Sequence, residues 1–454
     1  MNIAEEISAY AASLAYRDFD QLTIDTVKKR VVDSLACALG SLNSTPITAL
    51  QNFAKTVPVH QSTIIGSSRK TTPDIAALVN GSMVRYLDYN DGYIGKELGH
   101  PSDNIPACLA VAEAEGKTGP DLILAIVLAY EIQCRLQDAA CLYKLGWDHA
   151  NYVLISSTIG AGKLMGLDQH QLTQALNIAI NGHISLRQAR AGELSMWKGC
   201  SAANAARNGV FSAMLARQGL TGPSPIFEGE MGFIKQISNS LELDTATFGS
   251  KGNGDFAIKR SLTKLLPTQG EIQTAVWAGL KLRKRISNIE QIKSIHVATT
   301  HAAYRITASD PEKWRPKTRE TADHSLPFTL ARALLDGEIT PNSYADKKLE
   351  DPAAISLMAK ISASEDPALT DMFPQYIANR VTITLTSGEV LEEQVNTARG
   401  GRPDLPMSNE DFEHKFKQAT KPHINLKNQQ TAIDFVWKLD EKTHFGTLFK
   451  ALET

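Results

Sequence analysis

Apolar and polar positions along the first part of the chain follow the period of an α-helix. Apolar or small residues recur there at i, i+3, i+4 and i+7. The segments with this pattern are 24–42, 73–87, 120–136, 171–180 and 201–219. Pro73 and Pro120 suit the first turn of a helix. The many alanines and glycines of these segments predict closely packed helices, so this part of the chain predicts a large all-α domain.

The pattern changes after about residue 285. Residues 292–300 and 379–395 alternate in polarity and are rich in β-branched side chains, which is typical of strands. The second stretch predicts a hairpin that turns at Ser387 and Gly388. Helix-like segments lie between the two predicted strand regions, so this part of the chain predicts an α+β domain.

The length of 454 residues also favours two domains, because it exceeds one typical hydrophobic core. The helical period returns after about residue 407. We therefore predict a mainly α fold. Residues 1–265 with 407–454 are expected to form an all-α helical domain, and residues 266–406 a smaller α+β lid domain.

Composition and charge limit the classes of partner. Hydrophobic residues make up 43% of the chain and charged residues 21%, as in ordinary soluble proteins. The net charge of -2 gives no reason to expect binding to nucleic acid or to an acidic membrane surface. The start lacks the pattern of a signal peptide, and the most apolar window, 122–130, is too short to span a membrane. We expect a cytoplasmic enzyme.

Several common sites are absent from the sequence. The five cysteines are widely spaced and form no C-x-x-C pair, which argues against disulfides, a zinc site and an iron–sulfur cluster. No G-x-G-x-x-G follows a predicted strand, and there is no Walker loop or G-x-S-x-G motif. We therefore expect no metal and no nucleotide or redox cofactor.

Six polar clusters interrupt the apolar pattern. They contain Asp88, Asp91, His100, Ser102, Asp103 and Asn104; Asp148 and His149; Arg187, Arg190 and Lys198; Gln269, Glu271 and Gln273; Glu320, Asp323 and His324; and Arg399 and Arg402. Histidines with acidic groups suit proton transfer, whereas arginine and lysine suit the binding of carboxylates. Together the clusters predict acid–base chemistry on a small polycarboxylate.

Each cluster also has a structural interpretation. Ser102 or Asp103 is expected to cap the helix that follows. Lys198 can be a surface lysine packed on Trp197. Asp88 and Asp91 lie at a predicted helix end, where the helix dipole disfavours acidic residues, and this position favours another role for them.

Several sequence blocks resemble those of the MmgE/PrpD family in the same order. They are YLDYND with GHPSDN, GWDHANY, MWKG, LPTQGEIQTA and ADHSLPFTLARALLDG. The resemblance extends from VVDSLACALG to FEHKFK, which is nearly the whole chain. The family includes 2-methylcitrate dehydratase, cis-aconitate decarboxylase and iminodisuccinate epimerase.

The resemblance implies a large helical domain, a smaller lid domain, a homodimer and an active site in the cleft between the domains. By matching position, the catalytic residues would be Asp88, His100, His149 and Lys198. The implied substrate-binding residues are Asp91, Arg187, Arg190, Gln269, Glu271, Gln273, His324 and Phe328. It also implies catalysis without an iron–sulfur cluster, in agreement with the cysteine pattern.

Two positions depart from the family pattern. Phe328 stands where dehydratases and decarboxylases usually have tyrosine, which removes a phenol group. Gln273 stands where the family often has histidine, and an amide carries no proton to or from a substrate. Glu271 adds a carboxylate that repels a tricarboxylate unless it is protonated or faces away.

The working hypothesis is a lyase that removes water from 2-methylcitrate or a related hydroxy-polycarboxylate. His100 or His149 would be the base, and the other histidine or a protonated Asp88 would assist the loss of hydroxide. Lys198 with Arg187 or Arg190 would stabilise the developing aci-carboxylate. The alternatives are a decarboxylase-like or epimerase-like reaction, a metal-dependent lyase, and a relative that binds a small acid without catalysis.

Overall fold

A computed structural model describes residues 1–454, and the chain forms two compact units. The first unit comprises Met1–Ala189, Gly199–Leu262 and Met407–Thr454. The second comprises Arg190–Lys198 and Thr263–Pro406. The prediction of a mainly α fold with a smaller α+β part is confirmed. No helix is both long enough and apolar enough to cross a membrane.

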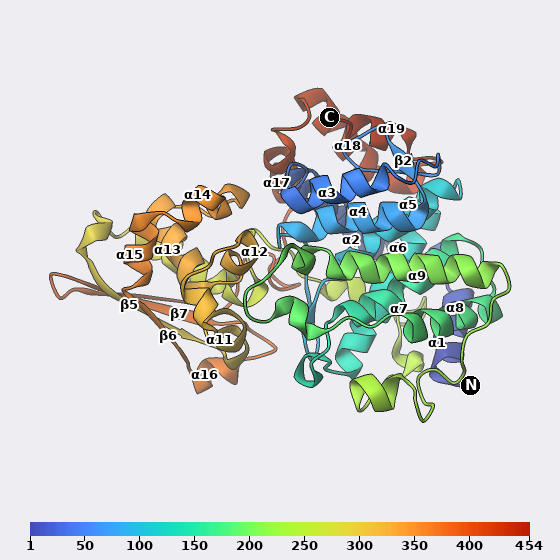
Figure 1. The fold of residues 1–454 in the computed structure, drawn as a ribbon, viewed down its shortest axis with the longest axis horizontal. Helices are drawn as coiled ribbons and strands as arrows, with labels where there is room; N and C mark the ends of the chain where they lie inside the picture. The colour runs from blue at the N-terminus through green and yellow to red at the C-terminus, as the bar shows by residue number, and fades with distance from the viewer. The chain divides into compact units, whose positions relative to one another are not determined.

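The first unit consists mainly of helices (Figure 1). They are α1 (Ile3–Ser13), α2 (Gln21–Gly40), α3 (Thr45–Ala54), α4 (Pro73–Tyr86), α5 (Ile105–Ala114), α6 (Gly119–Ala139), α7 (Ala150–Leu164), α8 (Gln169–Gly182), α9 (Ser201–Arg217), α17 (Asn409–Thr420), α18 (Leu426–Trp437) and α19 (Gly446–Ala451). Four short strands form two small hairpin-like pairs: β1 (Ser62–Thr63) with β2 (Lys70–Thr71), and β3 (Tyr93–Ile94) with β4 (Leu98–Gly99).

Small residues let the central helices of this unit pack closely. Helices α4 and α7 both pack against α9. A Cβ atom added to Gly81 on α4 would lie 2.8 Å from the Cβ atom of Ala203 on α9, closer than real Cβ atoms approach one another. The expected close packing of alanine- and glycine-rich helices is therefore observed, and any larger residue at Gly81 would push α4 away from α9.

The second unit is built on a four-stranded sheet in the order β6-β5-β7-β8. The strands are β5 (Ile292–Thr299), β6 (Ile361–Glu365), β7 (Asn379–Leu385) and β8 (Val390–Val395). Strand β5 runs parallel to β6 and antiparallel to β7, and β7 runs antiparallel to β8. The predicted hairpin is confirmed, because Gly388 turns the chain between β7 and β8 with a φ of +89°.

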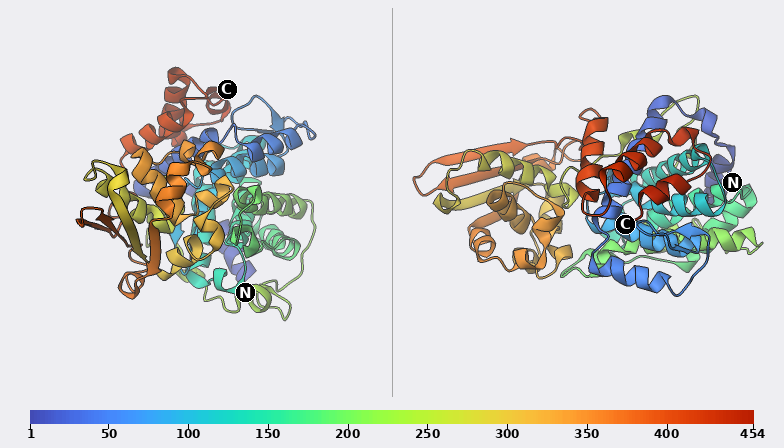
Figure 2. Two further views of the ribbon diagram at one scale, coloured as in Figure 1. Left: turned by 60° about the vertical axis from the view of Figure 1, so that its left-hand side comes forward. Right: turned by 90° about the horizontal axis from the view of Figure 1, so that it is seen from above.

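Helices cover one face of this sheet (Figure 2). The helices of the second unit are α10 (Gln273–Arg283), α11 (His301–Thr307), α12 (Arg319–Ala322), α13 (Leu326–Asp336), α14 (Asp346–Leu349), α15 (Pro352–Met358) and α16 (Pro367–Thr370). Helix α10 packs on β7 and β8, and α13 packs on β6. Side chains along β7 alternate between buried and half-buried, as expected for a sheet with one covered face.

The segment Arg190–Lys198 belongs to the second unit although it precedes α9 in the chain. Two hydrogen bonds fix it to α12. The Leu194 backbone N–H donates to Thr321 Oγ1 at 2.9 Å, and the Thr318 hydroxyl donates to the Leu194 carbonyl at 2.9 Å. These bonds give Lys198 a defined place beside the 318–324 segment.

Helix α17 follows the second unit in the chain and packs on the first unit, where a buried ion pair binds it to α2. The Lys415 ammonium lies 2.6 Å from Asp33 Oδ1 on α2, and both side chains are almost fully buried. It also donates to the Tyr89 carbonyl at 2.7 Å and lies 3.6 Å from the centre of the Tyr89 ring. Burial alone would lower the Lys415 pKa, but the negative charge of Asp33, together with the effects of Cys37 and Tyr89, raises it overall.

Replacing Lys415 by methionine is expected to destabilise the first unit by about 3–5 kcal/mol, because it leaves the buried Asp33 carboxylate without its counter-ion. The matched control is Lys417→Met, two residues further along α17. Lys417 pairs with Glu413 in a partly exposed contact, so its loss is expected to cost less than about 1 kcal/mol. Urea denaturation of both variants measures the difference. Equal destabilisation would contradict the assignment of Lys415.

Candidate active site

The loop that follows α4 carries the first polar cluster. Asp88 adopts a φ of +51°, a left-handed backbone conformation that is uncommon outside glycine. Its carboxylate forms an ion pair with Arg85 in the last turn of α4, and both side chains are buried. The ion pair holds the strained backbone in place, and such strain is often found at functional sites.

Asp91 is completely buried and its carboxylate is bonded on both oxygens. Oδ1 accepts the Ser102 backbone N–H at 3.0 Å, and Oδ2 accepts the Tyr130 hydroxyl at 2.8 Å. The Arg30 guanidinium lies 3.9 Å from Oδ2. Burial raises the Asp91 pKa, against the opposing effects of Arg30 and of these hydrogen bonds. Asp91, predicted as a substrate-binding residue, thus has three partners within the protein.

The backbone of Asp91 orients His100. Nδ1 of His100 lies 2.6 Å from the Asp91 carbonyl oxygen. A carbonyl only accepts hydrogen bonds, so Nδ1 carries the proton and donates it. Nε2 is therefore the nitrogen that is able to take up a proton from another group.

His149 lies next to His100 but has acidic neighbours. The two rings meet edge to face, with centroids 5.3 Å apart. Nδ1 of His149 lies 3.0 Å from Asp148 Oδ1, and Nε2 lies 3.9 Å from Asp103 Oδ2. Two carboxylates thus flank one imidazole ring, and their negative charge favours its protonated form.

Ser102 and Asp103 support the loop rather than cap the next helix. The Asn90 amide donates to the Ser102 hydroxyl at 2.9 Å and to Asp103 Oδ1 at 3.1 Å. The N-cap residue of α5 is Asn104, whose side chain makes no capping bond. The expected cap by Ser102 or Asp103 is wrong, because the chain first forms a short 3-10 turn, Pro101–Asn104, that places both residues before the helix start.

Glu97 is a buried acid outside the predicted set of site residues. Its Oε1 accepts the Leu142 backbone N–H at 2.7 Å and the Tyr152 hydroxyl at 2.8 Å. It precedes β4 and His100, while Tyr152 lies in the first turn of α7, just after His149. Burial raises the Glu97 pKa to about 7. No local sequence signal marks this glutamate, because its partners are distant in the chain.

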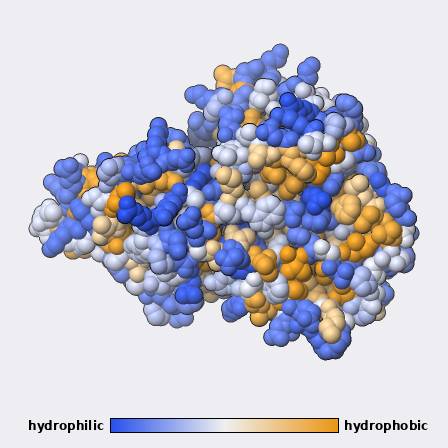
Figure 3. Space-filling model, in the orientation of Figure 1, coloured by the Kyte–Doolittle hydropathy of each residue, from blue (hydrophilic) through white to orange (hydrophobic).

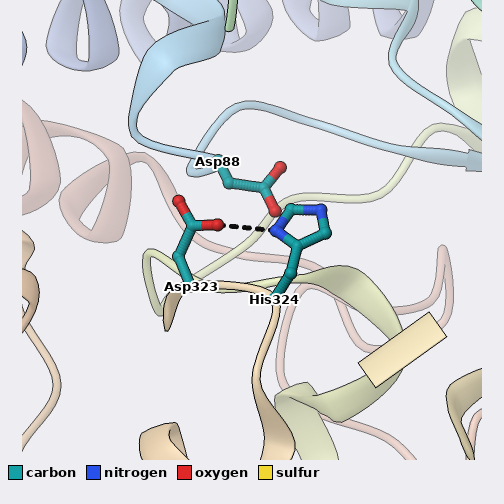
Figure 4. Close-up of side chains that lie close together, drawn as sticks. All are labelled: Asp88, Asp323 and His324. Carbon is teal, nitrogen blue, oxygen red and sulfur yellow. Dashed lines mark hydrogen bonds and ion pairs between the residues drawn. The ribbon is translucent and has the colours of Figure 1, made fainter. Parts of the chain in front are cut away.

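The second unit has its own cluster of charges around Asp323. The Lys198 ammonium lies 3.1 Å from Asp323 Oδ1, and the Arg319 guanidinium donates to Oδ2 at 3.2 Å. Nδ1 of His324 lies 2.6 Å from Oδ1, and Figure 4 shows this hydrogen bond. Asp323 is completely buried, which alone would raise its pKa, but Lys198, His324 and Arg319 together lower it. Asp323 is therefore an ionised carboxylate.

The loop before α10 binds mostly to itself. The Gln273 amide donates to the carbonyls of Leu266 at 2.8 Å and Thr268 at 3.0 Å. Its Oε1 atom is buried without a hydrogen-bond partner. The Gln269 amide donates to the Glu271 carboxylate and its Oε1 accepts the Glu271 backbone N–H at 2.8 Å. The Oε1 atom of Gln273 is thus a buried acceptor that receives no hydrogen bond from another residue.

The other predicted site residues lie in different surroundings. Phe328 is 1% exposed and belongs to the apolar core of the second unit, with its ring centroid 6.2 Å from that of Tyr344. The Arg187 guanidinium lies 4.3 Å over the Tyr143 ring in the first unit and is half-buried. Arg190 is half-buried in the second unit. The structure thus brings together His100, His149 and Asp91 in the first unit, and Lys198 with His324 in the second.

Two domains of one known family match the two parts of the chain. The MmgE/PrpD N-terminal domain matches residues 5–246, and the MmgE/PrpD C-terminal domain matches residues 266–441. The chain belongs to the MmgE/PrpD family.

Curated relatives in this family share somewhat more than a quarter of their residues with the chain. The probable 2-methylcitrate dehydratase of Saccharomyces cerevisiae is 28% identical over 93% of this chain and 86% of its own. The 2-methylcitrate dehydratase of Cupriavidus necator is 29% identical over 82% of this chain and 80% of its own. The alkylcitrate dehydratase phiI of a fungal species is 28% identical over 91% of this chain and 87% of its own.

The stability of the first unit is expected to depend on pH through Glu97. Its folded pKa of about 7 exceeds the ordinary value of 4.5, so the folded state binds the proton more tightly. The free energy of unfolding that this proton contributes is fully present below pH 4.5 and is lost as the pH rises through 7. Glu97→Gln mimics the protonated acid. Its unfolding free energy relative to wild type is expected to rise by about 3 kcal/mol from pH 4.5 to pH 8.

Urea denaturation at several pH values measures this difference. The exposed Glu242 provides the control, since Glu242→Gln is expected to follow the wild-type pH dependence. A Glu97→Gln variant whose stability parallels wild type across this range would show that Glu97 is ionised in the folded protein.

Proposed function

We propose that the protein dehydrates a small hydroxy-polycarboxylate of the 2-methylcitrate type by acid–base catalysis. The observation that carries this proposal is the pair of buried histidines, His100 and His149, with rings 5.3 Å apart. Elimination of water needs one group that takes a proton and one that gives a proton. The names of the relatives, 2-methylcitrate dehydratase and alkylcitrate dehydratase, support the reaction class and the type of substrate.

The different partners of the two histidines support different roles. His100 donates through Nδ1 to a neutral carbonyl oxygen, so Nε2 is the nitrogen that takes up a proton in this proposal. His149 lies against the Asp148 and Asp103 carboxylates, which stabilise a positive charge on its ring. His100 therefore acts as the base and His149 as the acid.

The reaction balances with these two groups. His100 Nε2 removes a proton from the carbon next to a substrate carboxylate, and the C–H electron pair forms the new carbon–carbon double bond. The C–O bond of the hydroxyl group breaks, and His149 gives a proton to the leaving oxygen, which departs as water. The products are an unsaturated polycarboxylate and one water molecule. Proton exchange with water returns both histidines to their starting forms.

Cationic groups balance the charge of the substrate. Lys198, Arg187 and Arg190 are the candidates for binding its carboxylates and for stabilising the aci-carboxylate that develops when the α proton leaves. The ion pair with Arg85 favours the charged form of Asp88. Asp88 is thus better suited to accept a hydrogen bond from a substrate hydroxyl than to act as a protonated acid.

The decarboxylase-like and epimerase-like reactions remain the alternatives, because they use the same binding groups on another carbon. NMR of mixtures with 2-methylcitrate, citrate, cis-aconitate and iminodisuccinate distinguishes them by their products. We expect an unsaturated product and water from 2-methylcitrate. Thermal stabilisation by these acids with no product formed would instead indicate a protein that only binds them.

Replacing either histidine is expected to lower kcat for dehydration by about 10²-fold or more, because each is needed for one proton transfer. His100→Asn and His149→Asn are the test variants. His170→Asn, in an exposed helical position, is the control and is expected to keep full activity. Steady-state kinetics with 2-methylcitrate measures the effect, and near-normal kcat in both test variants would refute the assignment.

We further propose that the protein works as a cytoplasmic homodimer. Exposed apolar side chains in the first unit, including Leu186, Phe211 and Leu220, support self-association. Figure 3 shows several groups of apolar residues on the face that it displays. One relative, the 2-methylcitrate dehydratase of Yarrowia lipolytica, is named mitochondrial.

A further inference from the structure

Asp323 connects three charged or titratable groups without itself reaching the surface. Its side chain has no exposed area, so it makes no contact with solvent. Oδ1 accepts from Lys198 at 3.1 Å and from His324 at 2.6 Å, while Oδ2 accepts from Arg319 at 3.2 Å. A buried carboxylate is stable only when its oxygens are bonded in this way.

The carboxylate also determines the charge of this group. Lys198 is completely buried, and burial alone would favour the loss of its proton. The contact with Asp323 compensates the charge, so Lys198 keeps its ammonium form. Two cations, Lys198 and Arg319, thus face one buried carboxylate.

The same residue sets the orientation of His324. An ionised carboxylate only accepts hydrogen bonds, so Nδ1 of His324 carries the proton and Nε2 remains for other contacts. The Asp323 backbone adds a further constraint. Its carbonyl accepts the Thr268 hydroxyl at 3.0 Å and the Gln269 backbone N–H at 3.0 Å. Asp323 therefore joins the 190–198 segment, the 266–273 loop and the start of α13.

We propose that Asp323 is a positioning residue that holds Lys198 and His324 as one functional group within the second unit. This inference rests on the proposed dehydration. Asp323 touches no substrate, and it acts by keeping Lys198 charged and by fixing the ring nitrogen that His324 presents. Lys198 and Asp323 then depend on each other, so removing one side chain removes most of what the other contributes to catalysis.

A double-mutant comparison tests this coupling. Lys198→Met and Asp323→Asn are each expected to lower kcat/KM for 2-methylcitrate by about 10²-fold. The double variant is also expected to lose about 10²-fold, whereas independent residues would give a product of about 10⁴-fold. The double variant buries no lone ion of this pair, so its comparison with Lys198→Met holds even if Asp323→Asn alone folds poorly.

Two further variants separate positioning from structural support. Asp323→Glu keeps the negative charge and is expected to recover at least about tenfold of the activity lost in Asp323→Asn. Asp336→Asn is the matched control, because Asp336 pairs with the buried Arg332 in the same unit. It is expected to lower the unfolding midpoint but to leave kcat/KM unchanged.

The outcomes distinguish this inference from the proposed function. Wild-type protein that forms no dehydration product would overturn the proposed function. Active wild type with a double variant about 10²-fold worse than Lys198→Met would overturn the positioning role of Asp323. The same conclusion would follow if Asp323→Glu recovered nothing.

Discussion

The candidate site of the first unit depends on the burial of one carboxylate, that of Asp91. A carboxylate without exposed surface is costly unless its oxygens are bonded, and here the Tyr130 hydroxyl and the Ser102 backbone N–H bond to it. These bonds tie the loop after α4 to α6 and to the 3-10 turn after His100. The orientation of His100 follows, because its ring donates to the carbonyl of the same aspartate.

A second pattern occurs once in each unit, where an aspartate directly precedes a histidine. Asp148 contacts Nδ1 of His149, and Asp323 contacts Nδ1 of His324. Both histidines lie at or just before the start of a helix, α7 or α13. The surroundings differ, since Asp323 also compensates Lys198 and Arg319. The carboxylate of Asp148 lies beside His149, where its negative charge favours a protonated ring.

The sequence predicts well the features that depend on local pattern. The helical period, the β-branched strands and the turn at Gly388 reveal the fold class because each depends on neighbours in the chain. Asp-His dipeptides and the LPTQG block likewise reveal candidate site residues. The roles of Asp91, Glu97 and Lys415 are not predictable in this way. Their partners lie from about ten to more than three hundred residues away, and burial decides their charge.

The structure shows the surroundings of Phe328 and Gln273, the two residues that depart from the family pattern. Phe328 packs in the core beside Tyr344, where a phenol oxygen would need a partner of its own. Gln273 uses its amide to fasten the Leu266–Thr268 turn and keeps one buried acceptor without a donor. Neither residue supplies a titratable proton. The proposed reaction assigns proton transfer to the histidines, and these two positions contribute shape and hydrogen bonding to the second unit.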